Sequence, residues 1–434
     1  MPLLRLLRRN TFTLIVSNAG SAILSFVLAA LIGRALGEDG LGIYTAALAW
    51  VFPLSLVVEF GIGTLITRDV AVQPTLSNAY LRLALWERFV FGGVILLILL
   101  VTAPLLSTSD AVSRGLIIAA PLVVINPLYG TFTALFRARQ IMLPIAVLNL
   151  GMLIAQVVFT AWVFATDGDV LDALMVNTLT SAGQMIFAGI WWVYFSNRRI
   201  IIDTVGAQNI TPVEDSRGDL LGRPPSGRPY DDNAMNFYHI LRRAYPFAVA
   251  AVLAALTTRV GYILLEQLTN TGEVGYFAAA NRVIEGVRML PNAFFGALFP
   301  LLASLSSDQP ALNRTFRQIT LGLTGFGGLV MLICTPLAGT IIMVIYGEAF
   351  TVAGGVLIVL AWGFLPAILR SGQTLYWYAR GGEQRVNAIT FGGLILQIAL
   401  SLWLIPSQGA LGLAWVILLT ETGMFLALLV GKNE

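Results

Sequence analysis

Apolar segments of about 20 residues recur along the whole chain with only short polar breaks between them, and this feature limits the possible folds most. An α-helix needs about 20 apolar residues to cross the hydrocarbon core of a bilayer. Only 11% of the 434 residues are charged, against about 25% in a soluble domain. The mean hydropathy is +0.82. The sequence therefore predicts an all-α polytopic membrane protein.

The apolar segments predict about twelve transmembrane helices. The first one follows a basic stretch, is too long for the apolar region of a signal peptide, and has no small-residue cleavage pattern after it. We expect it to be a true span. The predicted spans lie near residues 11–33, 42–66, 86–107, 115–135, 142–165, 173–195, 245–267, 275–303, 318–341, 351–371, 386–405 and 410–430.

The charges of the short loops predict the orientation. Nearly all loop arginines fall on the side of the N-terminus, whereas the loops of the other side hold only Arg34 and Arg114. Basic loops face the cytoplasm. We therefore expect a multi-pass protein of a bacterial or archaeal cytoplasmic membrane with both termini inside. The sequence pI of about 9.1 then reflects topology rather than nucleic-acid binding.

One long polar segment, residues 196–243, divides the chain into two halves of six spans, residues 1–195 and 244–434. Its Pro/Gly-rich composition predicts a flexible cytoplasmic linker. The halves share a short motif: Gly-Ile-Tyr-Thr-Ala-Ala at 42–47 and Gly-Tyr-Phe-Ala-Ala-Ala at 275–280. Both motifs open spans that run in the same direction. Parallel repeats of this kind are typical of transporters, with a central cavity between the halves near the midplane.

Some classes of site are not expected. The single Cys334 and single His239 argue against a disulfide framework and a Cys/His metal cluster. There is no phosphate-binding P-loop motif, and no carboxylate-rich metal site is expected. We therefore predict no enzyme activity, no cofactor and no metal.

Ionisable residues within spans are functional candidates, because they are costly in a membrane. Arg88 and Arg370 lie near the cytoplasmic ends of their spans, where long side chains can reach the headgroups. Arg259, Arg282 and Arg288 lie deeper.

The eighth span carries the densest set of polar residues. Helical spacing places Asn281, Glu285, Arg288 and Asn292 on one face, with Arg282 beside them. Such a face predicts a helix–helix contact or a water-filled cavity. Three other spans also carry polar or charged residues. Arg259 and Glu266 lie on the seventh span with Tyr262 nearby. The first span carries Asn18, Ser21 and Ser25, followed by Arg34, and the second carries Glu59 at its inner end.

Two interpretations of these charges stay open. Glu285 is three residues from both Arg282 and Arg288, so structural ion pairs between helices would satisfy them. However, the deep arginines outnumber the acids, and guanidinium groups match phosphate oxygens well. We favour a phosphate-bearing substrate. The candidate substrate-binding residues are Arg34, Arg259, Arg282, Glu285, Arg288, Asn281, Asn18 and Glu59.

Two blocks of the chain resemble a known family. The first comprises Gly33-Arg34-Ala35-Leu36-Gly37, Gly40-Leu41-Gly42-Ile43-Tyr44, Glu59-Phe60-Gly61-Ile62 and Thr67-Arg68, and the second comprises residues 274–282 (Val-Gly-Tyr-Phe-Ala-Ala-Ala-Asn-Arg), Leu290-Pro291 and Leu298-Phe299-Pro300-Leu301-Leu302. They resemble the polysaccharide (O-antigen type) flippases of the multidrug/oligosaccharidyl-lipid/polysaccharide transporter superfamily.

The resemblance implies a function and two site residues. Such a protein would carry a polyprenyl-pyrophosphate-linked oligosaccharide to the outer leaflet by alternating access, for cell-surface polysaccharide synthesis. In the related lipid II flippases, arginines of the first and eighth spans meet the pyrophosphate, and the matching positions are Arg34 and Arg282. The family often has an acid two residues after the arginine of the seventh span. Gly261 stands there instead, which puts a coupling-cation role at that position in doubt.

Two alternatives remain. A cation-coupled multidrug antiporter would have the same fold, but cationic drugs need an acidic cavity and the deep charges lean basic. A membrane glycosyltransferase is favoured only by Glu38 and Asp39, which follow the first span where some such enzymes carry a catalytic acid. The outer loops are too short to build a catalytic domain.

Overall fold

The computed structural model describes residues 2–197, 237–304 and 309–430. In these ranges every regular element is helical. The elements are α1 (Pro2–Glu59), α2 (Ile62–Val72), η1 (Pro74–Leu76), α3 (Ser77–Leu106), α4 (Asp110–Ala119), α5 (Leu122–Ala138), α6 (Met142–Ala165), α7 (Val170–Asn197), α8 (Phe237–Leu268), α9 (Thr271–Ser304), α10 (Gln309–Tyr346), η3 (Glu348–Phe350), α11 (Ala353–Ala379) and α12 (Glu383–Val430).

The twelve predicted spans fall on these helices, although the span at 42–66 continues from α1 into α2 and the span at 115–135 continues from α4 into α5. Within the described ranges, nine helical stretches are long and apolar enough to cross a membrane. Two of them, in α1 and α12, each contain two predicted spans, separated by a glycine of positive φ: Gly37 (φ 69°) and Gly409 (φ 55°). The remaining span is α9, which carries Arg282, Glu285 and Arg288 and is 34 residues long. The fold class predicted from the sequence is confirmed.

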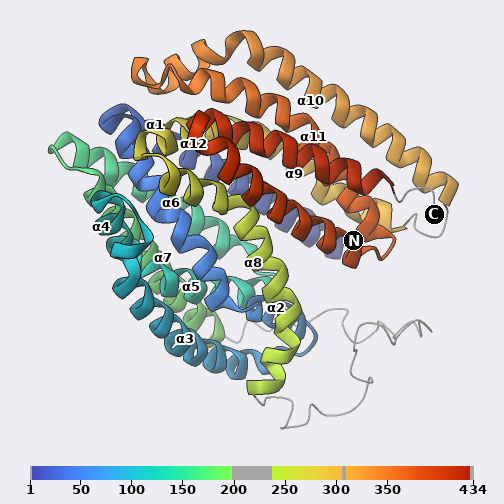
Figure 1. The fold of residues 1–434 in the computed structure, drawn as a ribbon. Coiled ribbons are helices and arrows are strands. Elements are labelled where there is room, and N and C mark those ends of the chain that lie inside the picture. Colours follow the sequence, from blue (N-terminus) through green and yellow to red (C-terminus); the bar gives the residue numbers. More distant parts are fainter. Residues whose placement is uncertain (1, 198–236, 305–308, 431–434) are drawn as a thin grey trace.

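The helices form two groups that follow the order of the chain. In Figure 1, α2 to α7 lie together, and α9 to α12 form a second group above them, with α1 and α8 between. The groups approach each other at the end where α1 and α12 kink, which we name the Gly37 end. They diverge toward the end that holds the turn between α5 and α6, which we name the α5–α6 end.

At the Gly37 end, the two repeat motifs cross each other with their backbones in contact. A Cβ atom on Gly42 would overlap the carbonyl oxygen of Thr271, and one on Gly275 would overlap the carbonyl oxygen of Glu38. Each glycine thus meets the residue four positions before the other glycine. This reciprocity is what a pseudo-two-fold axis between repeats produces, and it explains why both motifs begin with glycine.

Side chains add to this crossing. Thr271 Oγ1 donates to Asp39 Oδ1 at 2.6 Å, and Tyr276 Oη donates to Glu38 Oε1 at 3.3 Å. Glu273 Oε2 accepts the backbone N–H of Ala410 at 2.6 Å, just after the kink of α12. Asp39 and Glu38 therefore join the two halves at the Gly37 end, whereas Glu273 joins α9 to α12 within the second half.

The helix α8 contacts both groups. Near its start, Ile240 and Ala244 are buried among α2, α3, α5 and α7, and Arg243 Nη2 pairs with Asp69 of α2 at 2.9 Å. Near its end, α8 packs against α12. The predicted linker included residues 237–243, but the structure begins α8 at Phe237, so the linker prediction is wrong there. Residues 198–236 of that linker lie outside the described ranges.

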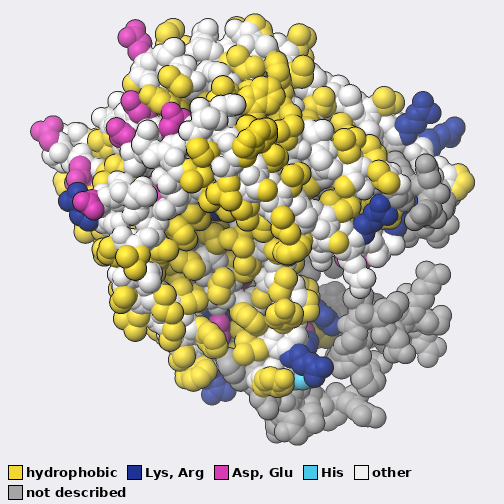
Figure 2. Space-filling model, viewed as in Figure 1, with side chains coloured by type: hydrophobic (Ala, Val, Ile, Leu, Met, Phe, Trp, Pro, Cys, Tyr) yellow, Lys and Arg dark blue, Asp and Glu magenta, His cyan; other side chains and the backbone are white. Residues whose placement is uncertain are grey.

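The surface fits a membrane. Figure 2 shows hydrophobic side chains over most of the visible face, whereas acidic side chains gather toward the Gly37 end and many basic ones toward the opposite side. Apolar side chains of α3 and α7 such as Leu97, Leu105, Phe187 and Ile190 are more than half exposed. Such exposure is unfavourable in water and favourable in lipid.

The glycine crossing makes a prediction about stability. We expect Gly42→Ala to lower the stability by about 1–3 kcal/mol, because the added methyl group meets backbone that cannot rotate away. The matched control is Gly93→Ala in α3, where a Cβ meets nothing within 4 Å. Thermal unfolding in one detergent compares them. An unfolding temperature for Gly42→Ala equal to that of the control would contradict the close crossing.

Candidate functional site

The polar face predicted on α9 is present and forms a connected cluster with α8. Arg282 Nη1 lies 2.8 Å from Glu285 Oε2, and both side chains are about one-third exposed, at 33% and 39%. Asn281 Nδ2 donates to Glu285 Oε1 at 3.0 Å and to the hydroxyl of Tyr262 at 2.9 Å. The sequence prediction that these groups share a face is met. The ion pair between Arg282 and Glu285, on which the structural interpretation rests, is also present.

Arg259 lies on the α1 side of this cluster and has no acid partner among the described residues. Its guanidinium carbon is 5.1 Å from the ring centroid of Phe52 in α1 and 5.9 Å from that of Tyr262. Its Nε is buried without a hydrogen-bond partner in the same part of the chain. Aromatic faces stabilise a cation only partly, so Arg259 keeps capacity to bind an anion.

A chain of polar side chains links Arg282 to the first half. The hydroxyls of Tyr44 and Tyr346 lie close enough to interact with Arg282 electrostatically. Tyr44 accepts a hydrogen bond from Asn177 Nδ2 at 2.9 Å, and Asn177 Oδ1 accepts one from Gln156 at 2.7 Å. Sequence analysis missed these residues. The available signal was a pair of amides in each of two largely apolar spans, Asn149 and Gln156 in one and Asn177 and Gln184 in the other.

Tyr346 is a second residue that the sequence analysis missed. Its side chain is only 2% exposed, and its hydroxyl has no hydrogen-bond partner among the described residues. It ends α10 and packs against Gly33 of α1. Buried polar groups without partners are rare, so this hydroxyl is available to a ligand that reaches Arg282.

A cavity of about 370 Å³ lies between α8, α9, α11 and α12. Asn281, Glu285 and Arg288 line it together with Tyr262. Arg288 has no ion pair among the described residues and also borders a smaller cavity beside Arg370. The structure thus brings three predicted α9 residues to one cavity. The side chain of Asn292 falls outside the described set.

Arg34 is engaged at the Gly37 end. Its Nε donates to the carbonyl oxygen of Ile345 at 2.7 Å, and its Nη2 donates to that of Val344. These carbonyls belong to the last turn of α10, where a basic side chain also interacts favourably with the helix dipole. Arg34 is exposed and does not pair with Glu38 or Asp39, which bond to Tyr276 and Thr271. Asn18, also a predicted site residue, is exposed on α1.

Glu59 lies away from this cluster, in the first half. Its Oε1 lies over Gly63, and the group interacts electrostatically with Glu87 and Arg88 of α3. Arg88 was expected to extend toward the headgroups, and this expectation is wrong. Its side chain is fully buried, donating to the carbonyl of Pro127 at 2.7 Å and pairing with Glu87 at 3.2 Å. The carbonyl oxygen of Pro127 in α5, which also accepts from Thr131 Oγ1 at 3.1 Å, thus holds Arg88 inside.

Two acids near the deep arginines are engaged by other groups. Glu266, expected near Arg259, instead accepts hydrogen bonds from Ser107 and Thr108 in the loop between α3 and α4. Arg370 forms a two-point pair with Glu421. Arg259 and Arg288 thus have no ion-pair partner in the part of the chain that the structure describes. No group of three or more His, Cys, Asp or Glu side chains there could hold a metal ion.

Comparisons with known proteins agree with this architecture. A family model described as "Polysaccharide biosynthesis protein" matches residues 7–306, more than half of the chain. No curated protein sequence matches. Among solved structures, the lipid II flippase MurJ in an inward closed conformation is similar, with a TM-score of 0.73 and 15% identity over 96% of this chain and 87% of that chain.

Other transporters of the MOP superfamily share the fold as well. An inward-facing MATE family transporter of the MOP superfamily has a TM-score of 0.72 at 12% identity, covering 95% of this chain and 93% of that one. A MOP superfamily transporter from Pyrococcus furiosus has a TM-score of 0.61 at 13% identity, covering 99% and 94%. The chain therefore has a MOP-superfamily transporter fold and belongs to the polysaccharide biosynthesis protein family.

Proposed function

We propose that this protein is a flippase that moves a polyprenyl-pyrophosphate-linked oligosaccharide across the cytoplasmic membrane, and that it has no enzymatic activity. The observation that carries the proposal is the excess of arginines over acids around α8 and α9. Among the described residues, Arg282 pairs with Glu285, whereas Arg259 and Arg288 have no ion-pair partner. A pyrophosphate offers several charged oxygens, which guanidinium groups bind in a two-point manner.

The architecture supports alternating access by the two halves. The halves are in contact at the Gly37 end and diverge at the α5–α6 end. The inward-facing MATE transporter is more similar to this chain than the outward-facing one, with TM-scores of 0.72 and 0.63. This likeness agrees with a conformation that is open at the α5–α6 end. Figure 2 places many of the basic side chains away from the Gly37 end, so we assign the α5–α6 end to the cytoplasm.

Arg282 is the residue most directly poised for the phosphate. It lies on the second half but interacts with Tyr44 of the first half and with the unpartnered hydroxyl of Tyr346. A site that both halves share can transmit binding to their relative position. Arg34 caps α10 in this conformation, so we propose that it reaches the substrate only when the Gly37 end opens. Asn18 and Glu59 stay predictions without a contact to this cluster.

A multidrug antiporter is the second candidate, favoured by one observation. The 370 Å³ cavity has the volume of a site for a small molecule and contains Glu285 and Tyr262. However, Glu285 is already bound by Arg282 and Asn281, and Arg288 adds a positive charge to the wall. The second acid of the wall, Glu421, is paired with Arg370, so a cationic drug would find no unpaired acid among the lining residues. We therefore rank this candidate second.

The unpaired arginines provide the main test. We expect Arg259→Gln and Arg288→Gln each to reduce flipping of a labelled polyprenyl-pyrophosphate oligosaccharide in proteoliposomes by about tenfold or more, because each removes a charge-assisted contact of about 1.5–3 kcal/mol. Arg114→Gln, an exposed arginine of α4, is the control. Unchanged flipping in both variants, or efflux of a cationic dye by the wild type, would favour the antiporter.

The ion pair on α9 can be tested separately. If Arg282 binds substrate, Arg282→Lys should impair flipping although the charge is kept, because an ammonium group cannot make the same two-point contact. The double variant Arg282→Gln/Glu285→Gln should stay inactive while remaining folded in the membrane. Recovery of flipping in the double variant relative to Arg282→Gln alone would mean that the pair is only structural.

The orientation also makes a prediction. A cysteine at Asp110, in the first turn of α4 at the Gly37 end, should react with a membrane-impermeant maleimide in intact cells. A cysteine at Gln140, in the turn between α5 and α6, should react only after permeabilisation. The native Cys334 is buried and contributes little background. The reverse labelling pattern would overturn the assigned direction of transport.

A further inference from the structure

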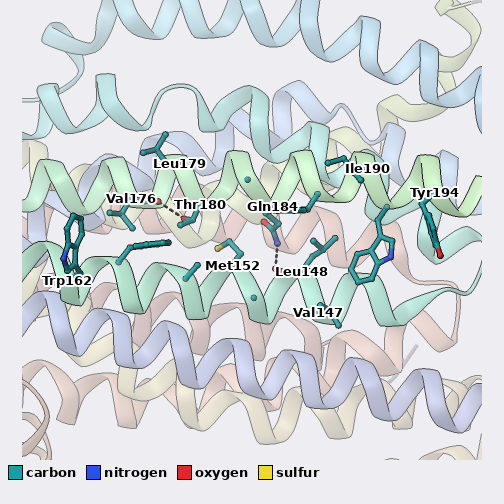
Figure 3. A pocket seen from close by; sticks show the side chains of 16 residues that line it. Val147, Leu148, Met152, Trp162, Val176, Leu179, Thr180, Gln184, Ile190 and Tyr194 are labelled. Atoms are coloured by element: carbon teal, nitrogen blue, oxygen red, sulfur yellow. Dashed lines mark hydrogen bonds between the residues drawn. The ribbon is translucent and has the colours of Figure 1, made fainter.

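A groove with a volume of about 1110 Å³ runs between α6 and α7 on the outer surface of the first half. Figure 3 shows the side chains that line it, from Trp162 at one end to Tyr194 at the other. Several lining side chains, including Leu179, Phe187 and Ile190, are about 60% exposed. The groove therefore opens away from the α8–α9 cluster, toward the surface that we assign to lipid.

Small residues create this groove. Gly151 of α6 and Gly183 of α7 line it, and a Cβ atom at either position would meet nothing within 4 Å. These glycines are thus not required by a close helix contact, unlike Gly42. Their effect is to leave space between two helices that otherwise pack along their length.

The groove is apolar along its whole length. Gln184 turns into the protein, where its Nε2 donates to Asn149 Oδ1 at 3.0 Å and to the carbonyl of Leu148 at 3.3 Å. Thr180 Oγ1 donates to the carbonyl of Val176 in its own helix at 2.7 Å. The side chains of Gln184 and Thr180 are therefore satisfied within the protein, and the middle of the groove suits a hydrocarbon chain rather than a headgroup.

The length of the groove indicates which hydrocarbon chains would fill it. Its α7 wall extends from Val176 to Tyr194, about 27 Å at about 1.5 Å per residue. The hydrocarbon core of a bilayer is about 30 Å thick, so the chains of one leaflet extend about 15 Å. A phospholipid from one leaflet would fill only about half of the groove. One chain that fills the whole groove is therefore much longer than a membrane acyl chain.

Two arginines lie near the α5–α6 end of the groove. Arg139 is 5.3 Å from the ring centroid of the buried Trp192, but its Nη2 donates to Ser77 Oγ of α3 at 2.9 Å, so it is already engaged. Arg137 is exposed in the last turn of α5 and interacts electrostatically with Tyr129, whose hydroxyl donates to Asn149 beside the groove. The charge of Arg137 complements a phosphate at the cytoplasmic membrane surface.

We infer that the groove between α6 and α7 binds the hydrocarbon chain of a polyprenyl phosphate lipid, with the phosphate near Arg137 and the chain running toward Trp162. This inference rests on the proposed function, because the same lipid carries the proposed substrate. It adds a binding surface separate from the α8–α9 cluster. The chain would remain at the lipid-facing side while the charged end moves between the halves.

Photolabelling tests the inference directly. The wild-type protein in bilayers is incubated with a polyprenyl phosphate that carries a photoreactive group at the far end of its chain, and labelled peptides are mapped. We expect label on α6 and α7 near Trp162, and competition by unlabelled polyprenyl phosphate but not by phosphatidylethanolamine. Equal competition by the phospholipid, or no label on these helices, would overturn the inference.

Matched variants separate filling of the groove from loss of folding. Gly183→Leu and Gly151→Leu fill the groove without meeting protein atoms at the Cβ, so we expect labelling to fall about tenfold. Gly392→Leu in α12, equally open and exposed but outside the groove, should leave labelling unchanged. Wild-type labelling that Gly183→Leu and Gly151→Leu do not reduce would also overturn the inference.

Flipping assays distinguish this inference from the proposed function. A wild-type protein that is labelled in the groove but does not flip a polyprenyl-pyrophosphate oligosaccharide would contradict the proposed function alone. A wild-type protein that flips this lipid without label in the groove would contradict the groove alone. With both correct, Gly183→Leu should slow flipping of the long-chain lipid more than that of an analogue with a short prenyl chain.

Discussion

The contact between Gly42 and Gly275 at the Gly37 end is the constraint on which the rest of the structure depends. Only residues without a Cβ allow the carbonyl oxygens of Thr271 and Glu38 to come this close. The crossing brings α1 against α9 and fixes where the two halves meet, so the space between them opens at the other end. The polar contacts beside it, such as that between Asp39 and Thr271, are hydrogen bonds that can be exchanged for water. A closure of this kind is tight and still reversible.

The crossing also determines the chemistry of the cluster below it. It places Tyr44 of the first half close enough to Arg282 of the second half for an electrostatic interaction. Arg282 therefore interacts with residues of both halves. The acids that could neutralise the neighbouring arginines are used elsewhere: Glu266 on the loop before α4, Glu421 on Arg370. The remaining positive charge lies at a depth where charge is costly unless an anion binds. In the proposed function, an anionic lipid headgroup would offset that cost.

Much of the fold could be predicted from the sequence, because the length of an apolar segment is a direct consequence of bilayer thickness. The kinks at Gly37 and Gly409 fall between predicted spans, as short breaks require. The α9 face was predictable from helical spacing alone. Contacts between distant helices were not: Arg34 on the end of α10 and Arg88 on the carbonyl of Pro127 depend on packing that no local pattern encodes. The groove between α6 and α7 was missed for the same reason. Its glycines leave space between two packed helices, and only the structure shows where that space lies.

In the proposed function, the two halves must separate at the Gly37 end before a lipid-linked oligosaccharide can cross the membrane. Cysteines replacing Asp39 and Thr271, whose side chains are in hydrogen-bond contact, can form a disulfide across the crossing once Cys334 is replaced by alanine. Flipping of a polyprenyl-pyrophosphate oligosaccharide is then measured in proteoliposomes before oxidation, after oxidation and after reduction. We expect flipping in the reduced protein, none in the oxidised protein, and full recovery on reduction. Equal flipping rates in the cross-linked and reduced states would contradict it.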